Sequence, residues 1–181
     1  EPIRSGEHLA KIMGGKGQRI RDNIREILPS ESSKNSELMN VYETIKRLLV
    51  QDLTISSFAD MYAQTLVYGL FVARFYDNSL GSFSRQEARD LIPASNPFLG
   101  HFFDHIAGRS FEKRLSYIVD ELCEVFTHAN VAELMEQHFR VSSKKGTQRG
   151  QDQVIHFYED FLKEYDDALR KRMGAYYTPL P

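Results

Sequence analysis

The chain has 181 residues, and its 23 basic and 25 acidic residues leave a formal net charge of −2. So balanced a charge excludes a general electrostatic attraction to nucleic acid or membranes, and any contact with DNA must be local. The single cysteine, Cys123, excludes a disulfide framework, and no apolar run approaches the ~20 residues of a membrane-spanning helix, so we expect a cytoplasmic protein without a membrane partner.

Helical periodicity dominates the sequence, and no convincing alternating strand pattern is present. We therefore predict an all-α fold, an irregular bundle of about seven to nine helices. The first helix is expected over 7–28. Gly14, Gly15 and Gly17 each cost about 1 kcal/mol relative to alanine inside a helix, which predicts a kink or a break there. The second helix is expected to start near Ser36.

The stretch 58–76 is apolar in nearly every direction around a helix, which is typical of a buried helix. We predict that this helix is the centre of the bundle. Ser57-Phe58-Ala59-Asp60 has the spacing of a capping box and predicts the start of the helix at Phe58. Gly69 in its middle predicts the close approach of a neighbouring backbone.

Capping signals predict the helices that follow. The predicted N-caps and their helices are Ser84 before 85–91, Asn96 before 97–108, Ser110 before an apolar stripe at 115–126, and Asn130 before 131–139.

The segment 141–150, VSSKKGTQRG, has no large side chain after its valine and no acidic residue, which is typical of a linker. It divides the chain into a helical spacer domain at 1–140, a basic flexible loop at 141–150 and a helical lead-in at 151–181. Within the lead-in we expect a helix capped by Asp152 and a separate short basic helix at 168–173.

Three basic residues of the loop, Lys144, Lys145 and Arg149, are candidates for contacts with the DNA backbone, because a flexible basic loop suits phosphate neutralisation. The alternative is a solvated charged linker, and the composition favours it.

His101 and His105 lie one helical turn apart, a spacing that two zinc ligands can use. The metalloprotease pattern requires glutamate directly after the first histidine and a third ligand, and neither is evident, so we favour an ordinary helix with both imidazoles at its rim. Asn96-Pro97-Phe98 resembles part of an amino-methyltransferase catalytic loop, but helix capping explains it fully. We predict no metal site and no catalytic residue in the chain.

A known family matches several stretches of the sequence. The segment 152–166, DQVIHFYEDFLKEYD, followed by RKRMGAYYTP at 170–179, resembles the lead-in to the methyltransferase domain of large single-chain restriction-modification enzymes of types IIG and ISP. The stretch 58–74, FADMYAQTLVYGLFVAR, is similar to the helical spacer of the same enzymes, and the stretch NPFL at 96–99 has a counterpart there. The resemblance covers the chain from about Ile45 onward.

The resemblance implies a partial cofactor site at the C-terminus. In that family a Gly-x-Tyr-Tyr-Thr-Pro segment is the first methyltransferase motif and helps to hold S-adenosylmethionine. The residues that match it or its approach are Gly174, Ala175, Tyr176, Tyr177, Thr178 and Pro179. They would form the incomplete start of an α/β methyltransferase domain. Mg²⁺ would serve only a nuclease domain upstream of this chain.

The resemblance also implies the function of a helical spacer between nuclease and methyltransferase modules. The parent enzyme would methylate adenine amino groups in a specific sequence of double-stranded DNA, and the fragment alone would be inactive. The start at Glu1 and the end on Pro181 fit an excised piece of a longer protein. Two alternatives are a free-standing helical module that binds a protein partner through an exposed aromatic groove, and a small metalloenzyme that uses His101 and His105.

Overall fold

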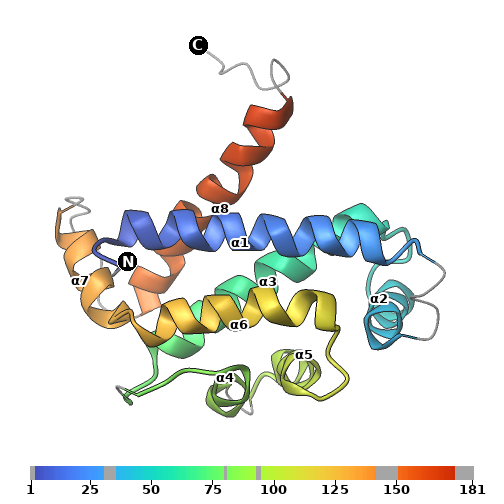
Figure 1. Ribbon diagram of the computed structural model, residues 1–181, viewed down its shortest axis with the longest axis horizontal. Helices are drawn as coiled ribbons and strands as arrows, with labels where there is room; N and C mark the ends of the chain where they lie inside the picture. Colours follow the sequence, from blue (N-terminus) through green and yellow to red (C-terminus); the bar gives the residue numbers. More distant parts are fainter. Residues whose placement is uncertain (1–2, 31–35, 80, 93–94, 142–150, 174–181) are drawn as a thin grey trace.

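The computed structural model describes residues 3–30, 36–79, 81–92, 95–141 and 151–173. Within these residues the chain forms eight α-helices and no strand, which confirms the predicted all-α class (Figure 1). The helices are α1 (Gly6–Ile27), α2 (Glu37–Leu48), α3 (Ile55–Phe75), α4 (Arg85–Leu91), α5 (Pro97–Ala107), α6 (Lys113–Thr127), α7 (Val131–Val141) and α8 (Gln151–Met173). In this part of the chain, no helix combines the length and the apolar character needed to cross a membrane.

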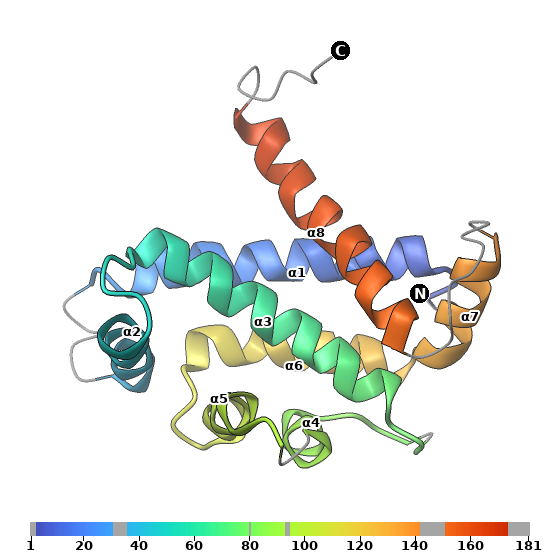
Figure 2. The same cartoon turned by 180° about the vertical axis from the view of Figure 1, so that it is seen from behind.

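The bundle is built on α1 and α3, which pack against each other and against α6 and α8. Figures 1 and 2 show α2 and α7 at opposite ends of the molecule and α4 and α5 along one edge. As predicted, α3 is the buried central helix, because ten of its residues from Phe58 to Arg74 are buried and five more are partly buried against the core.

The start of α3 differs from the prediction. Thr54 is the N-cap, and its hydroxyl accepts a hydrogen bond from the Ser57 N–H at 3.1 Å. The capping box predicted at Ser57 is therefore wrong, since Ile55 packs against the core and draws one more turn into the helix. Asp60 is freed from capping and pairs with another helix instead.

α1 is continuous through its glycines, so the predicted kink or break is wrong. A Cβ atom on Gly14 would lie 2.9 Å from the backbone of Glu164 and Tyr165, and one on Gly17 would lie 3.0 Å from the Tyr165 ring. The glycines thus allow α8 to lie directly on α1, and the packing gained there offsets their low helix propensity. At Gly69 the close neighbour is the Phe103 ring rather than the predicted backbone.

Capping was predictable at three of the four later helices. Ser84, Asn96 and Asn130 each accept a hydrogen bond from the N–H three residues on, at 3.2 Å. The prediction of Ser110 as a cap is wrong, because α6 begins at Lys113 and the carboxylate of Glu112 caps it.

α8 is one helix over Gln151–Met173, so the predicted division before residue 168 is wrong. Phe157, Phe161 and Tyr165 are buried against the bundle. Beyond them the helix projects away from the other seven, as both views show (Figures 1 and 2). The 141–150 boundary lies almost entirely outside the described residues, with only Val141 included, at the end of α7.

Candidate functional site

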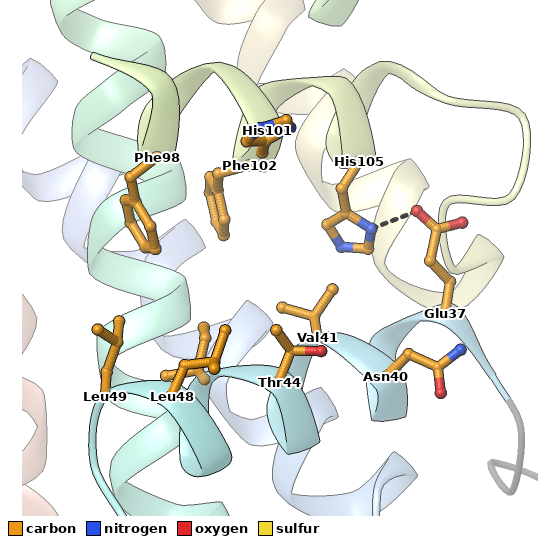
Figure 3. Close-up of a pocket in the computed structure, with 11 residues that line it drawn as sticks. Glu37, Asn40, Val41, Thr44, Leu48, Leu49, Phe98, His101, Phe102 and His105 are labelled. Atoms are coloured by element: carbon orange, nitrogen blue, oxygen red, sulfur yellow. Dashed lines mark hydrogen bonds and ion pairs between the residues drawn. The ribbon is translucent and has the colours of Figure 1, made fainter.

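The site residues that the sequence predicts fall in two segments of the chain. Lys144, Lys145 and Arg149, and the motif residues from Gly174 to Pro179, lie outside the described residues. The candidate site on the described residues is a cavity of about 460 Å³ between α2 and α5 (Figure 3). It is lined by Glu37, Asn40, Val41, Thr44, Ile45, Leu48, Leu49, Phe98, His101, Phe102 and His105, and these residues define what we call the groove.

The walls of the groove come from two helix faces that stand apart. α2 is held to the bundle by Leu38, Tyr42 and Ile45, and the Tyr42 hydroxyl donates to the Leu53 carbonyl at 2.9 Å. This attachment buries one side of α2. The face toward α5 is left uncovered, and Leu48 and Leu49 are each 66% exposed there.

One end of the groove is polar and hydrogen-bonded. The His105 Nδ1 lies 2.6 Å from a Glu37 carboxylate oxygen, and its Nε2 lies 2.7 Å from the Tyr62 hydroxyl. His105 is only 9% exposed and Tyr62 is fully buried. Burial, with the nearby carboxylates of Glu37 and Glu112, raises the pKa of Tyr62 well above its ordinary value.

These contacts indicate which group is the donor in each of the two hydrogen bonds. Tyr62 keeps its proton and donates it to Nε2, since a buried hydroxyl without an acceptor would cost about 1–3 kcal/mol. With Nε2 as the acceptor from Tyr62, the Nδ1 of His105 is the donor in the hydrogen bond to Glu37. In this hydrogen-bonded series of three side chains, the negative charge lies on Glu37. The second carboxylate oxygen of Glu37 points away from His105 (Figure 3).

The two histidines of α5 do different things. His101 is exposed, as expected for the rim of a helix, whereas His105 is buried, so its predicted place at the rim is wrong. Both ring nitrogens of His105 are engaged, by Glu37 and by Tyr62, which leaves neither nitrogen free to bind a metal. Across the described residues, no group of three or more His, Cys, Asp or Glu side chains is arranged to hold a metal ion.

Cys123 lies in the interior of α6, as its apolar stripe predicts. Burial raises the pKa of its thiol to about 12, so the thiolate needed for nucleophilic chemistry is not formed near neutral pH.

A second polar cluster holds α8 in place, and we call it the α8 junction: Arg21, Arg25, Asp60 and Tyr165, with Gly14 and Gly17. The Tyr165 hydroxyl donates to Asp60 at 2.6 Å, and Arg25 donates to the other oxygen of that carboxylate at 2.8 Å. The buried Arg21 guanidinium stacks over the Tyr165 ring, 5.2 Å from its centre. Helices α1, α3 and α8 are thereby locked together.

Comparisons with protein-family models, with curated proteins and with solved structures found no match.

Proposed function

We propose that the chain is a helical spacer that links the nuclease and methyltransferase modules of a DNA restriction-modification enzyme. The single observation that supports this most strongly is the path of α8. It starts against the bundle and runs without interruption to Met173, and in the sequence it is followed by the segment from Gly174 to Pro179 that resembles the first methyltransferase motif.

The physical basis is stiffness. A helix of 23 residues is about 34 Å long. The helix is anchored as far as Tyr165 by Phe157, Phe161 and the α8 junction, so the direction of its remaining residues follows the orientation of the bundle. A nuclease attached to the bundle would then act at a fixed reach from the DNA sequence that the methyltransferase recognises.

The parent enzyme would transfer a methyl group from S-adenosylmethionine to the amino group of adenine in double-stranded DNA. Tyr176, Tyr177 and Thr178 would contribute to the cofactor site through an aromatic face and a hydroxyl. Lys144, Lys145 and Arg149 would contact DNA phosphates. The bundle itself would supply no catalytic group.

The test uses the full reading frame, expressed intact and incubated with tritiated S-adenosylmethionine and mixed plasmid DNA. Label transfer to DNA that is lost in the Tyr177→Ala/Pro179→Ala variant supports both the function and the motif. The matched control is Tyr117→Ala, an exposed tyrosine on α6, which should transfer label normally. No transfer at all, from a reading frame that ends close to Pro181, would remove the methyltransferase proposal.

The second candidate function is a free-standing helical module that binds a protein partner. The groove between α2 and α5 favours it, because large apolar side chains are exposed there around a cavity.

A further inference from the structure

We propose that the groove binds an amphipathic helix of a protein partner, with a lysine or arginine of that helix against Glu37. This inference rests on the second candidate function, since it needs a protein partner, and it names the partner's chemistry. It is independent of methyl transfer.

The rim of the groove favours a macromolecule over a small molecule. Leu48 and Leu49 are each 66% exposed, and Phe98 on the facing helix is 49% exposed. A ligand confined to a cavity of about 460 Å³ would contact these side chains only where they face the cavity and would leave their outer sides in water. A helix laid along the groove would cover both the cavity and its rim, because apolar residues on one helical face meet neighbours on both sides.

The length of the groove suits a helix. Its α2 wall runs from Glu37 to Leu49, which corresponds to about 18 Å of helix. A partner helix of about three turns would therefore place apolar side chains at positions i, i+3 or i+4, and i+7 along it.

The negative charge at the Glu37 end of the groove favours a basic side chain at the facing end of the partner helix. Of the described residues that line the groove, Glu37 carries the negative charge and none is lysine or arginine. Glu112 also lies near Tyr62, but it is paired with Arg114. His105 fixes the Glu37 carboxylate by a hydrogen bond of 2.6 Å, so the anion is held in place before a partner arrives. A cationic side chain at that end of the partner helix complements it.

The experiment is a display selection against the intact 181-residue chain, using a library of 16-residue peptides with randomised positions in an alanine-rich helical frame. Enriched peptides should share the apolar spacing and carry a lysine or arginine at one end. Affinity of the best peptide is then measured by fluorescence polarisation, and NMR shift changes should map to α2 and α5.

Four variants sharpen the test. Leu48→Ser/Leu49→Ser should weaken binding about ten-fold or more, since it removes apolar contact area at positions that do not support the fold. Glu37→Gln keeps an acceptor for His105 but loses the charge, and should weaken binding about three-fold. The matched controls, Ile155→Ser on the exposed side of α8 and Glu124→Gln on α6, should bind as the unaltered chain does.

Several results would overturn the proposal: no enriched peptide, enriched peptides without a basic end, or binding that the groove variants leave unchanged. If light scattering shows a dimer, and the Leu48→Ser/Leu49→Ser variant is a monomer, the groove would be assigned to a second copy of the chain instead. These outcomes are separate from the label-transfer result, so the two proposals can fail independently.

Discussion

At the α8 junction a buried tyrosine meets a carboxylate and two arginines, whereas at the groove a buried tyrosine meets a histidine and a carboxylate. The junction is closed, because Gly14 and Gly17 let α8 lie against the backbone of α1. The groove is open, because α2 stands apart from α5 and exposes its leucines. Similar polar chemistry thus joins packed helices in one place and borders an exposed apolar groove in the other.

The largest expected change in the free energy of unfolding that both regions share appears at alkaline pH. Burial raises the pKa of Tyr62 and that of Tyr165 above the ordinary value of 10.0. Their stabilising contribution is complete below pH 10 and is lost as the pH rises above it, because the unfolded chain releases the two protons and the folded chain keeps them. The free energy of unfolding should fall by roughly 3 kcal/mol by pH 11 from these two groups.

Urea unfolding at a series of pH values measures this fall. The double variant Tyr62→Phe/Tyr165→Phe should show a shallower decline above pH 10. An identical slope in the double variant would contradict the assignment.

The next prediction concerns the α8 junction alone. Gly14→Ala should lower the free energy of unfolding by about 1–3 kcal/mol, because its Cβ would meet the α8 backbone. Gly15→Ala is the matched control on the same helix. Its Cβ meets open space, so it should stabilise the chain by up to about 1 kcal/mol. Thermal melts that rank the two variants in the opposite order would show that α8 does not rest on α1.

At neutral pH, removal of the Tyr62 hydroxyl and removal of the Tyr165 hydroxyl should lower the free energy of unfolding by different amounts. Tyr62→Phe leaves the buried Nε2 of His105 without its partner and should cost about 2 kcal/mol. Tyr165→Phe should cost only about 1 kcal/mol, because Asp60 is partly exposed and keeps Arg25. Denaturant unfolding of the two variants measures the difference. A larger loss of unfolding free energy for Tyr165→Phe would contradict the prediction that the Tyr62 hydroxyl contributes more to stability.

The smallest expected change in the free energy of unfolding is at the groove. Leu48→Ser/Leu49→Ser should change the free energy of unfolding by only about 0.5 kcal/mol, since both side chains are mostly in water. Leu38→Ala, a buried leucine on the same helix, should cost about 2–5 kcal/mol. Equal losses in the two variants would mean that the rim leucines are structural.

Much of the fold could be predicted because its signals are local. Ser84, Asn96 and Asn130 each cap the helix that follows them, and the apolar pattern around Phe58 to Phe75 marks the central helix. Local signals fail where two neighbours compete, as with Thr54 and Ser57 at the start of α3. The glycines of α1 were misread because their role depends on α8, about 150 residues away.

The candidate site was largely hidden from the sequence. The spacing of His101 and His105 places them on one helix, but nothing local distinguishes the buried imidazole from the exposed one. Glu37, the partner of His105, lies 68 residues away in the chain. The two exposed leucines at the end of α2 were the one local signal, since an amphipathic helix with apolar residues outside its buried stripe often has a second contact face.

The central proposal is that α8 holds the bundle at a fixed orientation relative to a methyltransferase module that would follow it. The most direct measurement is the position of DNA cleavage by the full reading frame, compared between Ala168→Pro and Ala168→Ser. Proline removes a backbone hydrogen bond and bends the helix, whereas serine does not. We predict that the proline variant still methylates DNA but spreads its cuts over several distances from the recognised sequence, while the serine variant cuts at one. Cleavage at the same single distance in both variants would contradict the account.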